Sequence, residues 1–178
     1  MISGHRTRLR ALERDDLDSL FAWWNDPRLW TLIGSPSRIS SSEELEAWFE
    51  GELDKTSPQE GRTFAIDDQK DRLIGTAWYG TYEAADRQAT VGLYLGESED
   101  RGKGYGTDAL GTLCSYLFDE QGLHKARLYV ERENLAAIAV YRKLGFVEEG
   151  RLREHRFYGG TFHDFLVMGL LSREFSRS

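Results

Sequence analysis

The chain has 178 residues, of which 40% are hydrophobic and 30% charged, with only 3 prolines. This balance suits one folded domain over 1–178 and excludes a disordered tail or a collagen-like fibre. The net charge of −7 disfavours a nucleic-acid partner, and it suits either a cationic partner such as an amine or simple solubility.

The single cysteine, Cys114, excludes an intramolecular disulfide framework and favours a cytoplasmic protein. Cys114 stands in a helical apolar pattern, so we interpret it as a small buried hydrophobe rather than as a nucleophile. The first ten residues contain no apolar run, and no apolar stretch approaches the roughly 18 residues of a membrane helix. The sequence therefore predicts no signal peptide and no membrane partner.

The first 60 residues predict a mainly helical part. Apolar residues three and four apart indicate a helix at 17–24, which follows the acidic run 13–16 and is ended or kinked by Pro27. The other segments expected here are a strand at 7–12, a loop at 34–42, a helix capped by Ser41 or Ser42 that runs through Leu45, Trp48 and Phe49, and a polar loop at 54–61.

From residue 61 to 171, alternating patterns predict strands with two helices between them. The strands are expected at 62–67, 73–79, 90–95 and 125–131, followed by a closing hairpin of 146–157 and 162–171 that turns at Gly159-Gly160. One helix is expected over the apolar stripe Leu110, Leu113, Cys114, Leu117 and Phe118 and ends at Gly122, and another runs from Asn134 through Leu144 to Gly145. This order predicts an α/β fold with a partly antiparallel sheet.

A glycine-rich loop at 101–107 lies between a predicted strand and a predicted helix. Its glycines allow positive φ and close approach to a ligand, and Arg101 and Lys103 add positive charge. The following helix N-terminus would offer free N–H groups to phosphate oxygens, although a plain tight turn is the alternative. The Walker pattern is absent and Thr107 breaks the dinucleotide pattern, so ATP and NAD are disfavoured.

The chain resembles the GNAT superfamily of acyl-CoA-dependent N-acyltransferases through three motifs in the family's order. The motifs are Arg101-x-x-Gly104-x-Gly106; Asn134-x-x-Ala137-Ile138-x-x-Tyr141-x-Lys143-x-Gly145-Phe146; and the run from Glu148 to Glu154 with Phe162-His163-Asp164 and Met168. Trp24-Asn25-Asp26-Pro27 also resembles the family's first helix. The branch that it resembles contains ribosomal-protein N-terminal acetyltransferases and spermidine N-acetyltransferases.

The resemblance implies a mixed, mostly antiparallel central sheet that splays into a V between 90–95 and 125–131 and is flanked by helices. It also implies acetyl-CoA as cosubstrate and no metal. Strand backbone would pair with the pantetheine amides, the glycine loop would hold the pyrophosphate, and Asn134 would bond the cofactor, cap its helix or do both. The residues assigned to acetyl-CoA are Tyr94, Leu95, Arg101, Gly102, Lys103, Gly104, Tyr105, Gly106, Thr107, Asn134, Ala137 and Lys143.

The resemblance assigns Tyr141 as the general acid that protonates the departing CoA thiolate, and a core aromatic is the alternative. Many members carry a glutamate where this chain has Thr90, which accepts no proton. A base would then be Glu83, Asp86 or Glu97 acting through water. An acceptor of low pKa, such as an α-amino group near about 8, has less need of a base.

The helical part, 1–60, would frame the acceptor amine. Acceptor contacts are assigned to Asn25, Asp26, Arg28 and Glu83, and the His163-Asp164 pair is open between a structural and a catalytic role. We therefore predict an acetyl-CoA-dependent N-acetyltransferase that acts on a protein N-terminus or a small-molecule amine. The alternative is a non-catalytic acyl-CoA-binding sensor or interaction module. A homodimer is an expectation from the family.

Overall fold

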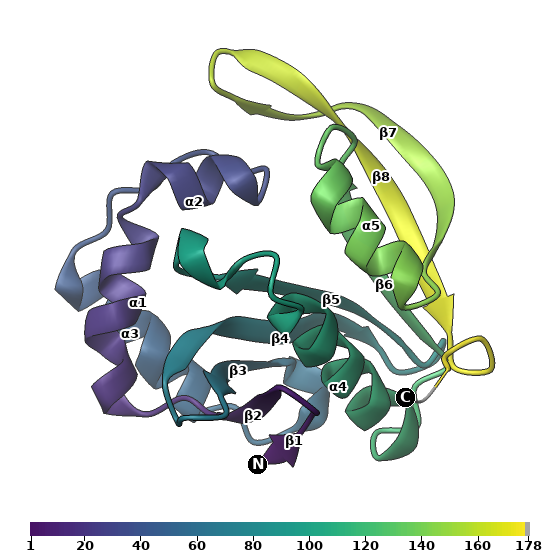
Figure 1. Cartoon of the computed structure of the whole chain (residues 1–178), viewed down its shortest axis with the longest axis horizontal. Helices are drawn as coiled ribbons and strands as arrows, with labels where there is room; N and C mark the ends of the chain where they lie inside the picture. Colours follow the sequence, from purple (N-terminus) through teal and green to yellow (C-terminus); the bar gives the residue numbers. More distant parts are fainter. Residues whose placement is uncertain (177–178) are drawn as a thin grey trace.

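The computed structural model describes residues 1–176, and its centre is one eight-stranded sheet (Figure 1). The strands are β1 (Ile2–Ser3), β2 (Thr7–Ala11), β3 (Arg62–Asp68), β4 (Leu73–Glu83), β5 (Gln88–Leu95), β6 (Lys125–Glu131), β7 (Val147–Tyr158) and β8 (Thr161–Leu171). They lie in the order β1-β2-β3-β4-β5-β6-β8-β7. Only β5 and β6 pair in parallel, so the mixed, mostly antiparallel sheet expected from the sequence is confirmed.

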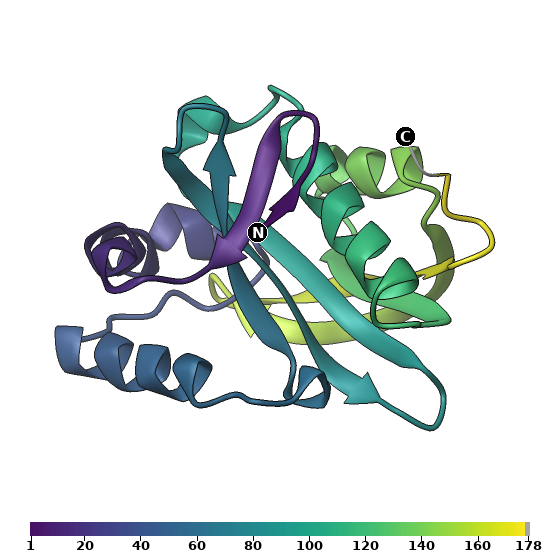
Figure 2. The ribbon, with the colours of Figure 1, turned by 90° about the horizontal axis from the view of Figure 1, so that it is seen from below.

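Helices cover both faces of this sheet (Figure 2). The α-helices are α1 (Leu17–Trp24), α2 (Pro27–Leu32), α3 (Ser42–Leu53), α4 (Tyr105–Asp119) and α5 (Leu135–Lys143), and short 3-10 turns lie at Arg14–Asp16, Pro58–Glu60 and Ser98–Asp100. α4 and α5 pack on one face, whereas α1, α2 and α3 pack on the other. No α-helix in residues 1–176 is both long enough and apolar enough to span a membrane.

Alternation along β5 sends its side chains into two separate cores. Val91 and Leu95 join a cluster under α4 and α5, and Tyr94 packs on the other side with Trp23 and the first three α-helices. Cys114 is fully buried in the first cluster, where burial raises its thiol pKa to about 12. The interpretation of Cys114 as a buried hydrophobe is confirmed.

Several element boundaries differ from those expected, and three of the differences concern segments that the sequence analysis interpreted specifically. Pro27 begins α2 rather than ending α1, because the first helical position needs no N–H donor, and α1 already ends at Trp24. β4 runs on through a bulge to Glu83, beyond the expected end at 79. α4 ends at Asp119, so Gly122, with a φ of +64°, lies in the turn after the helix rather than directly at its end.

β5 and β6 are paired only at their beginnings. The last paired residues are Thr90 and Arg127, after which β5 continues to Leu95 and β6 to Glu131 without pairing to each other. In Figure 1 the two strands meet near the end of β8 and diverge from there. This split confirms the expected V and leaves one backbone edge of β5 without a strand partner.

Candidate functional site

The glycine loop, 101–107, leads into the start of α4 and leaves the N-terminal end of this helix open. Gly102 and Gly104 adopt φ values of +75° and +85°, which favour glycine and turn the loop tightly into the helix. No side chain of residues 1–176 caps α4, so its first N–H groups are available to a ligand. These donors and the positive end of a 15-residue helix fit a pyrophosphate.

Two arginines hold this loop through backbone carbonyls. Arg101 donates through Nη2 to the carbonyl oxygens of Leu95 and Gly96, at 3.3 and 3.1 Å. Arg6 donates through Nη1 to the carbonyl oxygen of Lys103 at 3.3 Å. Arg101 therefore braces the end of β5, while the Lys103 side chain remains more than half exposed.

The side chains of Tyr94 and Leu95 are packed in the cores, so only their backbone groups face the split. The Tyr94 ring packs edge-on against Trp23 with centroids 6.1 Å apart, and burial raises its pKa. The Leu95 side chain is buried under α4. Any contact that these two residues make across the split therefore uses N–H and C=O groups.

Asn134 ties the start of α5 to the end of α2. Its Oδ1 accepts from the Ala137 N–H at 3.1 Å, and its Nδ2 donates to the Leu32 carbonyl at 3.0 Å. The helix-cap role expected for Asn134 is therefore present, and each end of its amide makes one hydrogen bond within the protein. Lys143, at the other end of α5, is exposed.

Tyr141 is the partly buried aromatic of α5. Its ring lies 6.0 Å from that of Phe146, and its hydroxyl has no hydrogen-bond partner within residues 1–176. Burial raises its pKa to about 12, so the phenol stays protonated at neutral pH. A protonated phenol without a partner suits the role of proton donor.

A compact polar cluster occupies the apex of the split, on the sheet face opposite α4, which we call the far face. Arg127 bonds Glu83 at 2.6 Å, and its Nε lies 3.4 Å from the hydroxyl of Thr90. Gln88 donates to the other Glu83 oxygen at 2.6 Å. The bonds from Arg127 and then Gln88 lower the pKa of Glu83, so this carboxylate is a weak proton acceptor.

The acceptor residues expected on the first helices lie apart from this cluster. The Asn25 side chain holds the loop before α3, because it donates to the Ser40 carbonyl and accepts from the Ser40 N–H. Asp26 caps α2 and pairs with Arg28, whose bonds lower the Asp26 pKa. Within residues 1–176 none of these three side chains bonds Glu83, so the structure does not gather the four expected residues into one group.

His163 has the contacts of a structural residue. Its Nδ1 lies 2.7 Å from Glu131 Oε1, and its Nε2 lies 3.2 Å from the Tyr158 carbonyl oxygen. The Tyr158 ring stacks on the imidazole at 3.8 Å. Asp164 is likewise engaged, by the Arg151 guanidinium and the Glu154 N–H. These contacts favour the structural interpretation of the pair.

A bulge in β7 brings a further histidine to the far face. Leu152 pairs with Phe165, and the next pair along the strands is Arg156 with His163. Three residues of β7, 153–155, therefore lie opposite a single residue of β8. The bulge contains Glu154 at a φ of +49°. Bulges re-aim side chains in this way.

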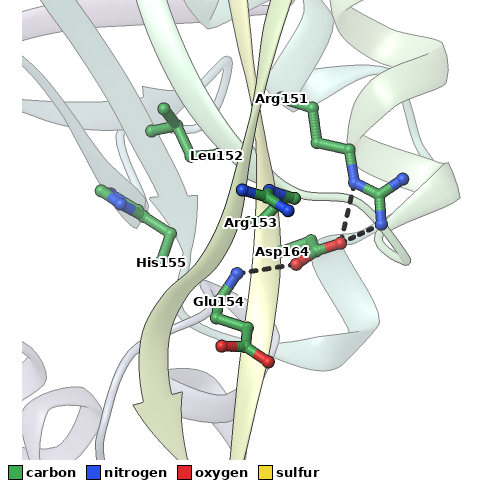
Figure 3. A pocket seen from close by; sticks show the side chains of 6 residues that line it. All are labelled: Arg151, Leu152, Arg153, Glu154, His155 and Asp164. Atoms are coloured by element: carbon green, nitrogen blue, oxygen red, sulfur yellow. Dashed lines mark hydrogen bonds and ion pairs between the residues drawn. The ribbon is translucent and has the colours of Figure 1, made fainter.

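His155 is the residue that this bulge re-aims. Figure 3 shows His155 and Leu152 on one side of β7 and Arg151 with Asp164 on the other, around a surface hollow of about 650 Å³. The His155 ring stacks on Tyr129 of β6 at 6.1 Å and lies 5.5 Å from Phe165. Within residues 1–176 its ring nitrogens have no hydrogen-bond partner.

Two more aromatic residues border the split on this face. Tyr129 stands two residues beyond the last paired residue of β6, and Trp78 covers Gly92 at the corresponding level of β5. The sequence analysis missed Arg127, Tyr129 and His155. Strand alternation at 125–131 would have placed the first two on one face, but nothing in the pattern of residues indicates the β7 bulge.

Comparisons with known proteins agree on one family. The domain family described as "Acetyltransferase (GNAT) domain" matches residues 6–147. A spermidine N(1)-acetyltransferase of Escherichia coli (strain K12) is 31% identical, over 98% of this chain and 91% of that protein. A putative ribosomal N-acetyltransferase of Bacillus subtilis is 32% identical over 57% of this chain and 55% of its own length. The crystal structure of spermidine N-acetyltransferase from Vibrio cholerae in complex with CoA and spermine is 29% identical, with a TM-score of 0.86 over 94% of this chain and 96% of that one.

Proposed function

The chain belongs to the acetyltransferase (GNAT) domain family, and we propose that it moves an acetyl group directly from acetyl-CoA to a primary amine of a small molecule or a protein N-terminus. The observation that carries this proposal is the split between β5 and β6 beside the uncapped start of α4. The unpaired edge of β5 suits the amides of pantetheine, as an added strand would pair with it. The start of α4 suits the pyrophosphate.

Tyr141 serves as the general acid in this proposal. The amine nitrogen bonds the thioester carbon and releases one of its protons to water, the carbon–sulfur bond breaks, and the sulfur leaves with the proton of the Tyr141 hydroxyl. CoA then departs as a thiol rather than as a thiolate. The Tyr141 hydroxyl, with a pKa of about 12, stays protonated across the neutral pH range. Water returns the proton to Tyr141 after each turnover.

We assign His155 as the base that accepts the proton of the acceptor amine. Thr90 accepts no proton, and Arg127 keeps Glu83 in its ionised, weakly basic form. Histidine is the side chain that most often acts as a general base, and the β7 bulge presents His155 to solvent beside Tyr129 at the split. The ammonium proton passes through water to the imidazole, which leaves a neutral amine to attack.

Relatives named for spermidine support a small amine as the first acceptor to test. The carboxylate of Glu131 lies on the far face, pairs with no lysine or arginine within residues 1–176, and suits a further cationic group of such a molecule. A protein N-terminus carries a single cation and is the second acceptor to test.

The test is release of free CoA thiol from acetyl-CoA with spermidine, with a peptide that has a free N-terminus, and with no amine. Thiol release that requires one of the amines, together with acetylated product in the mass spectrum, supports the proposal. Saturable CoA binding by calorimetry with no thiol release for either amine would identify a binding module instead.

A further inference from the structure

A second hollow, of about 330 Å³, lies beside the glycine loop, away from the split. Three segments distant in sequence meet there: the chain before β2, the turn between β3 and β4, and the loop itself. The residues that line it include Arg6, Asp68, Lys70, Arg72, Lys103 and Tyr105. The proposed function uses only the glycine loop and assigns no ligand to the cationic side chains of the other two segments.

The positive charge of this hollow exceeds its negative charge. Arg72 is neutralised, since it bonds buried Asp100 with both terminal nitrogens, at 2.7 and 2.8 Å, and Asp68 at 3.2 Å. Lys103 lies at 3.8 Å from Asp100, a loose pair. Within residues 1–176 the side chains of Arg6 and Lys70 pair with no carboxylate. In a chain of net charge −7, such surplus cations indicate an anionic ligand.

The connection to the glycine loop restricts what that anion is. Lys103 and Tyr105 belong both to the hollow and to the loop that suits the pyrophosphate, so a ligand held by the loop extends directly into the hollow. CoA carries a third phosphate, a monoester on the 3′ carbon of its ribose, one sugar away from the pyrophosphate. Lysine and arginine are the side chains that recognise a phosphate monoester.

We propose that Arg6, Lys70 and Lys103 bind the 3′-phosphate of CoA in this hollow. The inference rests on the proposed function, because it takes CoA as the ligand of the loop. It adds that the protein distinguishes CoA from dephospho-CoA, which lacks only this phosphate. Arg6 then has two tasks, since it also holds the Lys103 carbonyl.

The experiment is calorimetric titration of the full chain with CoA, dephospho-CoA, adenosine 3′,5′-bisphosphate and inorganic phosphate. We expect CoA to bind at least about tenfold more tightly than dephospho-CoA, as a charge-assisted contact warrants, and adenosine 3′,5′-bisphosphate to compete with CoA. Equal affinity for CoA and dephospho-CoA would overturn the inference and leave the proposed function intact. Absence of binding by both would overturn the proposed function as well.

Two variants and one control locate the contact. Lys70→Gln should weaken CoA binding about tenfold while the affinity for dephospho-CoA stays the same. Arg6→Gln also loses the bond to the glycine loop, so it should weaken both ligands, but CoA more than dephospho-CoA. Lys70→Gln is the cleaner variant, because the Lys70 side chain bonds nothing else within residues 1–176. Arg14→Gln removes the same charge from an exposed site near α3 and should change neither affinity. Equal weakening of both ligands, or tight binding of inorganic phosphate alone at the hollow, contradicts the assignment.

Discussion

At the scale of single residues, neighbouring charges decide which groups of the site exchange protons. Glu83 shares its Arg127 partner with Thr90, and the bonds from Arg127 and Gln88 hold this carboxylate ionised. Tyr141 is affected in the opposite sense, because burial away from any charge raises its pKa to about 12. Glu83 thus remains ionised because of its neighbours, and Tyr141 remains protonated because of its burial.

Replacing Tyr141 with phenylalanine removes the proposed proton donor and keeps the ring contact with Phe146. We expect kcat to fall about 100-fold, with CoA affinity nearly unchanged. Steady-state thiol release and calorimetry measure the two quantities. Tyr116→Phe, on α4, is the matched control and should keep full kcat. A Tyr141→Phe enzyme with normal kcat would remove this residue from the mechanism.

Replacing His155 with phenylalanine keeps an aromatic ring against Tyr129 and removes the proposed proton acceptor. We expect kcat/KM to fall about 100-fold at pH 7 and to recover as the pH approaches the pKa of the amine, where neutral amine needs no base. The pH–rate profile tests this, and His124→Phe at an exposed site before β6 is the control. An unchanged profile would mean that the amine loses its proton to water alone.

At the scale of elements, the split depends on how its two sides are held. α4 is anchored to the chain start by Asp108, whose carboxylate accepts the N–H groups of His5, Arg6 and Thr7. α5 is held to α2 by Asn134, and α2 is also held by Arg156, which donates to Gly34 and Ser35 just beyond it. The bonds of Asn134 and Arg156 thus join the two sides of the split, whereas those of Asp108 hold α4 within one side.

Two substitutions separate the cap of α5 from its link to α2. Asn134→Asp keeps the oxygen that accepts from Ala137 and loses the donor to Leu32, so we expect a loss of about 1 kcal/mol in the free energy of unfolding. Asn134→Ala loses both bonds and should cost about 2 kcal/mol. Urea unfolding at neutral pH measures both. Equal losses for the two variants would show that the cap to Ala137 contributes nothing, and an Asn134→Asp protein as stable as the wild type would show the same of the bond to Leu32.

At the scale of the whole molecule, the buried thiol of Cys114 makes the free energy of unfolding decrease as the pH rises above 9. Its pKa is about 12 in the folded protein against an ordinary 9.0, so above pH 9 the unfolded chain binds fewer protons than the folded one. This contribution is complete below pH 9 and is lost as the pH rises toward 12. Between pH 8 and pH 10 the loss from this group is about 1 kcal/mol.

Urea unfolding at pH 8 and pH 10, for the wild type and for Cys114→Ala, tests this contribution. The alanine variant is less stable at both values because it leaves a cavity, and the comparison concerns only the change with pH. The wild type should lose about 1 kcal/mol more than the variant between the two values. Parallel losses would show that the thiol does not remain protonated in the fold.

Local patterns in the sequence were sufficient to predict much of this protein. Period-two and helical spacing identified most strands and helices, and the glycine loop indicated an open helix end, because such features depend on residues adjacent in the chain. The split itself was expected only from the family resemblance that the glycine-loop and Asn134 motifs carry. Folding was needed to bring Arg127 against Glu83, to bend β7 so that His155 meets Tyr129, and to gather Arg6 and Lys70 beside Lys103. These contacts join segments up to about a hundred residues apart, and their geometry depends on strand register and bulges that no local pattern specifies.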